Sequence, residues 1–171
     1  MMFLFNCIIQ FLVAMIATIA FSILFSAPKK ELLFCGFTGA LGWIVYYIMT
    51  QKNINLIFSA AIATFVLTVF ARSFAVIRRN PATVYLVTGI FPLVPGAGIY
   101  YTAYYLFTRN NTMSGLKAIE TFEMAGAIVF GIVFGFAIPQ KLFLKLRNKN
   151  CLEEYEKSGE EQLLLISNLL G

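Results

Sequence analysis

Long apolar runs separated by short polar segments account for most of the chain. Stretches of about 20 apolar residues, the length that crosses a bilayer as a helix, occur five times. They cover residues 4–27, 32–50, 54–75, 82–107 and about 118–139. The pattern therefore predicts an all-α integral membrane protein. Residues 1–140 form a bundle of five transmembrane helices, and residues 141–171 form a polar tail.

The fourth run contains an interruption, because residues 89–100 read GIFPLVPGAGIY. Pro92 has no N–H for the carbonyl of Thr88, and Pro95 has none for the carbonyl of Phe91. Residues before a proline also avoid helical backbone angles. We therefore predict that the fourth helix is broken at a Pro-x-x-Pro-Gly motif, with two unpaired carbonyls.

A broken helix places unpaired backbone groups in the membrane, where they must line protein or a watery cavity. Gly96 and Gly98 would permit an irregular turn before the helix restarts. Free carbonyls suit a cation and free N–H groups suit a carboxylate, so a small zwitterion or a dicarboxylate would fit. The alternative is a kink without a ligand, which is common in membrane helices. The candidate substrate path comprises Thr88, Phe91, Pro92, Pro95, Gly96, Gly98 and Tyr100.

Composition agrees with a membrane protein, since 60% of the 171 residues are hydrophobic and 12% are charged. With five spans, ten basic residues fall on one side and three on the other, which predicts an N-terminus outside and a C-terminus in the cytoplasm. The ten are Lys29, Lys30, Arg72, Arg78, Arg79, Lys141, Lys145, Arg147, Lys149 and Lys157, and the three are Lys52, Arg109 and Lys117. The net charge of +5 then reflects topology and anionic lipid, with no nucleic-acid partner.

The residues that several kinds of catalytic or metal site require are absent from the sequence. The chain has no His and no Asp, which removes a His metal site, a Ser/His/Asp triad and a paired-aspartate site. Cys7, Cys35 and Cys151 show no Cys-x-x-Cys spacing and are interpreted as structural. We therefore predict no enzyme activity, no metal site and no cofactor.

Small and hydroxyl residues recur every four positions within the spans. Thr18, Ser22 and Ser26 do so in the first span, and Thr64 and Thr68 in the third. Such stripes are typical of helix packing, although they could also line a polar path.

The fifth span carries Ala127, Gly131 and Gly135, a small-residue seam that lets a neighbouring helix approach closely. Glu123 lies one turn before this seam. An acid inside a membrane is a candidate for proton coupling. The alternative is an interfacial acid near a helix N-terminus, where its charge suits the helix dipole.

Three segments resemble the C-terminal membrane domain of the threonine/serine exporter family. The most specific is RRNPATVYLVTGIFPLVPGAGIYYTAYYLF, residues 78–107, with the Pro-x-x-Pro-Gly motif of a broken helix. The segments FSAPKKELLFCGFTGALGW and GAIVFGIVFGFAIP are similar to the first loop with the second helix and to the last helix. The resemblance carries over Pro92, Pro95 and Gly96 as motif positions.

The resemblance implies a separate small subunit that works with a larger membrane subunit of the same family. It also implies export of threonine and serine, and in some members of dicarboxylates such as succinate. The expected function is thus a small subunit of a two-component secondary exporter in the plasma membrane, with a small-molecule substrate. The alternative is a structural or assembly subunit that stabilises a larger transport partner without contacting the substrate.

Overall fold

The computed structural model describes residues 2–139, which are helical with short connections. The elements in chain order are α1 (Met2–Leu24), η1 (Lys29–Glu31), α2 (Leu32–Gln51), α3 (Leu56–Arg78), α4 (Ala82–Ile90), η2 (Phe91–Leu93), α5 (Gly96–Phe107) and α6 (Asn111–Ala137). Within this part of the chain, four helices are long and apolar enough to cross a membrane, and the count rises to five if α4, η2 and α5, a pair bent at the break, form one span. The predicted all-α membrane class is confirmed. The tail, residues 141–171, lies outside the described residues, so its division from residues 1–140 stays a prediction.

The helix ends agree with the apolar runs except at the last span. Helix α6 begins at Asn111, about two turns before the predicted start at residue 118. The reason is local, because the Asn110 side chain accepts a hydrogen bond from the N–H of Met113 and caps the helix. At 27 residues α6 is about 40 Å long. That exceeds a hydrocarbon core of about 30 Å, so polar residues are tolerated in its first turns.

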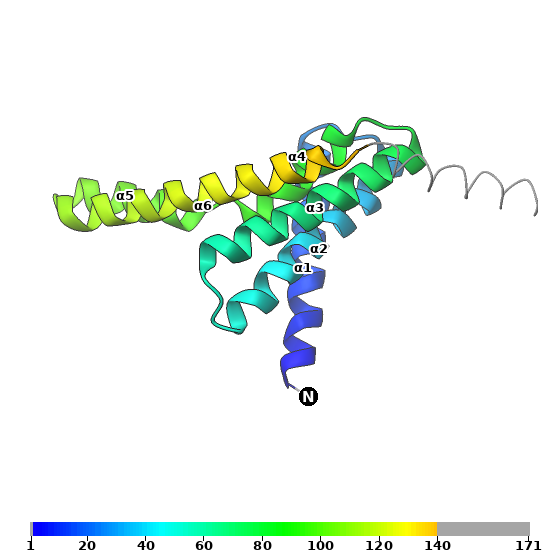
Figure 1. The fold of residues 1–171 in the computed structure, drawn as a ribbon. Helices are drawn as coiled ribbons and strands as arrows, with labels where there is room; N and C mark the ends of the chain where they lie inside the picture. The colour runs from blue at the N-terminus through cyan, green and yellow to red at the C-terminus, as the bar shows by residue number, and fades with distance from the viewer. Residues whose placement is uncertain (1, 140–171) are drawn as a thin grey trace, which may run out of the picture.

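Helices α1, α2, α3 and α4 pack together, and the second half of α6 crosses α3 (Figure 1). Glycines face threonines at these contacts: a Cβ at Gly39 would meet Thr18, one at Gly131 would meet Thr64, and one at Gly135 would meet Thr68. Small residues of this kind allow close approach of helix backbones in membranes.

The hydroxyl stripes serve this packing. Thr18 donates to the carbonyl of Ala14 at 2.8 Å, and Thr68 donates to that of Thr64 at 2.7 Å. Each hydroxyl is thereby satisfied within its own helix, so the threonine side chain can pack against a glycine of the neighbouring helix without an unpaired polar group. Ser26 lies beyond the end of α1 and is exposed, so it is not part of the stripe.

Polar side chains join three elements where the α1–α2 and α3–α4 connections meet. Glu31 is buried and lies 2.9 Å from the guanidinium of Arg78. The hydroxyl of Tyr85 donates to the same carboxylate at 2.7 Å, and the Asn80 amide donates to that hydroxyl at 3.4 Å. The guanidinium of Arg78 also lies over the ring of Phe34, 4.5 Å from its centroid. This polar cluster ties η1, the end of α3 and the start of α4 together.

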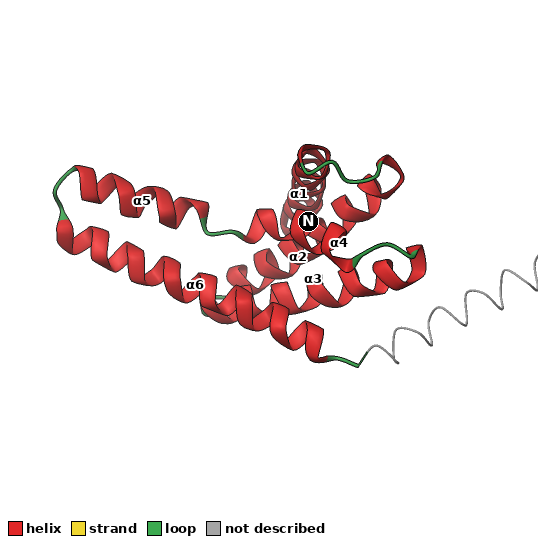
Figure 2. Cartoon of the chain, turned by 90° about the horizontal axis from the view of Figure 1, so that it is seen from above, coloured by secondary structure: helices red, strands yellow, loops and turns green. Residues whose placement is uncertain are grey.

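The first half of α6 leaves the other helices and pairs with α5 alone. Figure 2 shows α5 and this half of α6 side by side, extending away from α1–α4. No residue of α5 is buried. We call residues 96–124 the hairpin, and residues 2–93 together with 125–137 the bundle. The two regions meet at the break between η2 and α5.

Candidate functional site

The break lies between two helical segments that meet at a bend of 50°. Helix α4 ends at Ile90, η2 covers Phe91–Leu93, and α5 starts at Gly96. The carbonyl of Phe91 accepts a hydrogen bond from the N–H of Val94 at 3.2 Å. The prediction of an unpaired carbonyl at Phe91 is therefore wrong, because the tighter 3₁₀ turn supplies a donor three residues later.

The turn itself is made by proline. Pro95 has φ −76° and ψ 59°, and the N–H of Gly96 donates to the carbonyl of Val94 at 2.7 Å. These are the features of an inverse γ-turn. No glycine in residues 2–139 has a positive φ, so the expectation that Gly96 and Gly98 permit an irregular turn is also wrong. Both are instead the first helical residues of α5.

The glycines have spatial roles. A Cβ at Gly98 would collide with the side chain of Thr121, so this glycine lets α5 approach α6. A Cβ at Gly96 would meet no atom within 4 Å. Gly96 therefore keeps space open beside the break.

Side chains on both sides fix the position of the break. The ring of Phe91 stacks on that of Phe21 in α1, with centroids 4.5 Å apart. Leu93 is buried in a cluster with Ala63 and Leu67 of α3. Because neighbouring residues are held by different helices, the bend has a defined geometry.

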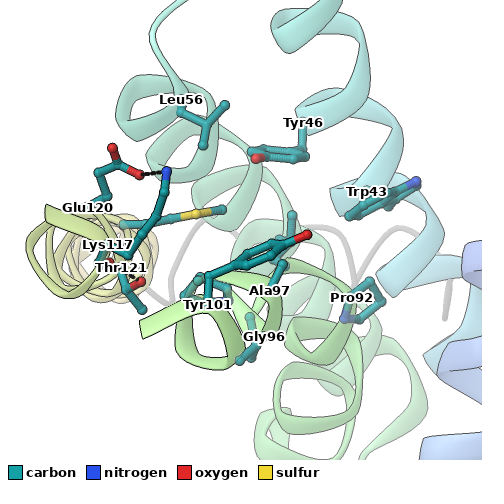
Figure 3. A pocket seen from close by; sticks show the side chains of 15 residues that line it. Trp43, Tyr46, Leu56, Pro92, Gly96, Ala97, Tyr101, Lys117, Glu120 and Thr121 are labelled. Carbon is teal, nitrogen blue, oxygen red and sulfur yellow. Dashed lines mark hydrogen bonds and ion pairs between the residues drawn. The ribbon is translucent and has the colours of Figure 1, made fainter. Parts of the chain in front are cut away.

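A pocket of about 360 Å³ lies beside the break. Small-molecule sites typically measure about 300–1,000 Å³. Its walls come from α2, the start of α3, the break, α5 and α6 (Figure 3). The lining residues are Trp43, Tyr46, Leu56, Pro92, Leu93, Val94, Pro95, Gly96, Ala97, Gly98, Tyr101, Lys117, Glu120, Thr121 and Met124.

Polar groups reach this pocket from two sources. The N–H groups of Ala97 and Gly98, at the start of α5, donate to no backbone carbonyl of the described residues. They lie at the positive end of the helix dipole, which favours an anionic group. On α6, the ammonium group of Lys117 lies 2.7 Å from a carboxylate oxygen of Glu120. Figure 3 shows this pair on one side of Tyr101, with Trp43 and Tyr46 on the other.

The structure brings together part of the predicted substrate path. Four of its residues line the pocket: Pro92, Pro95, Gly96 and Gly98. Three lie elsewhere. Thr88 is 2% exposed and donates to the carbonyl of Val84 at 2.8 Å, and Phe91 packs on α1. Tyr100 is 62% exposed and its ring stacks on that of Tyr104, along α5.

The predicted packing and coupling residues occupy different surroundings. Ala127, Gly131 and Gly135 are buried, and a Cβ at Gly131 would meet the α3 backbone at the carbonyl of Ala61. Glu123 is exposed on α6 and has no hydrogen bond or ion pair with the described residues.

Several pocket residues were not identified from the sequence. Trp43, Tyr46 and Tyr101 belong to spans rich in aromatic residues, so nothing local distinguishes them. Lys117 and Glu120 did carry a signal, since charged residues are unusual within a span. Lys117, however, falls just before the predicted start of the last span at residue 118, and Glu123 was preferred as the coupling acid.

The sequence model of the family described as "Threonine/Serine exporter, ThrE" matches residues 10–138. The chain belongs to the threonine/serine exporter family. It is thus a multi-pass membrane protein of a transporter family, and the broken helix and its pocket lie within the matched region.

An uncharacterized protein of Haemophilus influenzae is 24% identical over 148 residues, which cover 84% of this chain and 50% of that protein. The chain therefore spans about half the length of the curated relative that it matches. No solved structure matches the chain.

Proposed function

We propose that this chain is the small membrane subunit of a two-component secondary exporter of small polar metabolites. Threonine and serine are the first candidates, and dicarboxylates such as succinate are the second. The observation that carries the proposal is the pocket of about 360 Å³ at the broken helix of a threonine/serine exporter family member. The substrate path runs along Pro92, Pro95, Gly96 and Gly98, and the membrane gradient drives export.

The broken helix suits this role because it exposes backbone groups at membrane depth. Transporters commonly bind substrate where half-helices end, with N–H groups directed at an anionic substrate group. The N–H groups of Ala97 and Gly98 are available for a substrate carboxylate. We retain Thr88, Phe91 and Tyr100 as flanking residues of the path, and Glu123 as the proposed proton-coupling acid.

A larger membrane subunit of the same family is the proposed partner. Helix α5 has no buried residue in this chain, and apolar side chains such as Phe107 and Phe122 are exposed. Another subunit would cover part of this surface, and lipid would cover the rest. We place the protein in the plasma membrane with its N-terminus outside and its C-terminus in the cytoplasm, as the basic residues predict.

The deciding experiment measures export from cells that lack other exporters. The chain is expressed alone and with its candidate larger partner, and efflux of preloaded threonine, serine and succinate is followed. We expect efflux only when both chains are present. Absence of efflux despite verified assembly would contradict the proposal and favour the structural or assembly role.

A double substitution tests the broken helix itself. Pro92→Leu with Pro95→Leu restores the missing N–H donors and favours a continuous helix. We expect efflux to fall to background while the two chains still assemble in the membrane. Gly126→Ala is a matched control, because a Cβ there meets no atom within 4 Å. Undiminished efflux by the double variant would exclude the break from the substrate path.

A further inference from the structure

The pocket beside the break contains one acid and one base among its lining residues. Lys117 and Glu120 lie three positions apart on α6, with side chains 37% and 62% exposed. The remaining lining side chains are apolar, aromatic or, at Thr121, a hydroxyl that donates to the carbonyl of Lys117 at 2.6 Å. The charge of the pocket wall therefore depends on this pair.

The pair does little for the fold. An exposed ion pair between residues on one helix contributes little to stability, because water screens the two charges. It joins no two elements, in contrast to Glu31 and Arg78, which connect η1 to the end of α3. Ionisable residues within a membrane-spanning segment are otherwise unfavourable and generally mark a pathway. The length of α6 allows polar residues in its first turns, but packing in the described residues does not require these two charges.

Charge complementarity indicates what the pair would accept. A ligand carrying only a carboxylate would pair with Lys117 but would be repelled by Glu120. A cation would pair with Glu120 but would be repelled by Lys117. A dicarboxylate would bring its second negative charge to Glu120. A ligand with adjacent opposite charges satisfies both side chains at once.

Resting on the proposed function, we propose that Lys117 and Glu120 bind substrate directly and select a small zwitterion, as a free α-amino acid is, over a dicarboxylate. The carboxylate of the ligand pairs with Lys117 and with the N–H groups that begin α5. Its ammonium group pairs with Glu120. The aromatic side chains of Trp43, Tyr46 and Tyr101 enclose the rest of the ligand.

The chain has a built-in reporter of this site. Trp43 is its single tryptophan and lines the pocket, with its Nε1 donating to the side chain of Gln10 at 2.9 Å. The full 171-residue chain in lipid nanodiscs is titrated with threonine, serine and succinate while tryptophan fluorescence is recorded. We expect a saturable change with threonine and serine and a much weaker response to succinate.

Single substitutions separate the two charges. Lys117→Gln and Glu120→Gln should each weaken threonine binding about tenfold or more, the loss expected when a hydrogen bond to a charged group is removed. Glu120→Gln should at the same time strengthen succinate binding, whereas Lys117→Gln should not. Lys117→Arg keeps the charge and should keep threonine binding. Lys52→Gln is the control, since Lys52 is exposed in the α2–α3 connection away from the pocket.

Different outcomes test the binding role of Lys117 and Glu120 and the proposed export function. Charge-dependent threonine binding without export in cells would support the assignment and contradict the export function. Export that is unchanged in both glutamine variants would support the export function and overturn the assignment. The assignment would also be overturned if no ligand altered the fluorescence. The same holds if the ligands altered it equally in all variants while the helical content stayed unchanged.

Discussion

Among residues 2–139, the bundle contains the ion pair of Glu31 with Arg78 and the hairpin that of Lys117 with Glu120, and the two pairs differ in sequence separation and exposure. Glu31 and Arg78 are 47 residues apart, and the Glu31 side chain is 6% exposed. Tyr85 and Asn80 extend their network to α4. Lys117 and Glu120 lie on adjacent turns of one helix and are largely exposed. The charges of the Glu31–Arg78 pair therefore join elements, whereas those of the Lys117–Glu120 pair stay within one helix, where we propose that they bind a ligand.

The glycines of the two regions follow the same division. In the bundle, threonine side chains of a neighbouring helix occupy the space beside Gly39, Gly131 and Gly135. At the break, Gly96 has open space, and only Gly98 contacts another helix closely. The bundle is closely packed, while the hairpin leaves room beside the site. We therefore expect changes in the bundle to affect stability and changes in the hairpin to affect transport.

The largest expected effect comes from alanine at the seam between α6 and α3. In Gly131→Ala the added Cβ meets the Ala61 carbonyl and the Thr64 hydroxyl, and backbone atoms cannot move away easily. We expect the free energy of unfolding to fall by about 3 kcal/mol, the upper range for overpacking. Detergent-denaturant titration followed by circular dichroism measures it. Gly126→Ala, on the same helix but in open space, should be neutral. Equal losses of stability in both variants would show that close packing of Gly131 against α3 is not the cause.

Neutralising the bundle acid should have the next largest effect. Glu31→Gln removes the negative charge that Arg78 and Tyr85 contact, and leaves a partly buried guanidinium unpaired. We expect a loss of about 2 kcal/mol, below the figure for a fully buried pair because Arg78 is one-third exposed. Glu120→Gln should change stability by less than about 0.5 kcal/mol. If both acids affected unfolding equally, the division between structural and ligand-binding charges would not hold.

The smallest effect is expected at the break, where two glycines stand two residues apart. Gly98→Ala should reduce stability by about 1 kcal/mol, because the Thr121 side chain can move aside. Gly96→Ala should be neutral or slightly stabilising, since its φ is ordinary and alanine favours a helix. It should nevertheless slow efflux, because Gly96 lines the pocket and the added methyl group takes up space beside the break. Thermal unfolding and efflux measured on the same variants would separate the two effects. If Gly96→Ala lowered stability and efflux together, the prediction for Gly96 would be wrong.

Much of the fold could be predicted from the sequence because helix formation in a bilayer is local. The apolar runs gave the helices, and two prolines located the break between α4 and α5. Details of the break were less predictable. Whether the carbonyl of Phe91 finds a donor depends on the 3₁₀ turn that the chain adopts there, and not on proline alone.

The site was only partly predictable, since it depends on contacts between distant residues. Pro92 and Pro95 line the pocket, but its opposite walls come from α2 and α6. In the sequence, Glu31 follows two lysines and precedes an apolar run, and no local pattern marks it as structural. Its role emerged only when α3 and α4 brought Arg78 and Tyr85 to it.

By itself the sequence determined the membrane class and the position of the interruption. Each follows from hydrocarbon length and from backbone hydrogen bonds that close within a few residues. Tertiary structure alone decided that Glu120 lines the pocket and Glu123 does not. The two acids lie within one turn of α6, so the sequence does not separate them, and the packing of α6 against α3 and α5 decides which of them reaches the pocket.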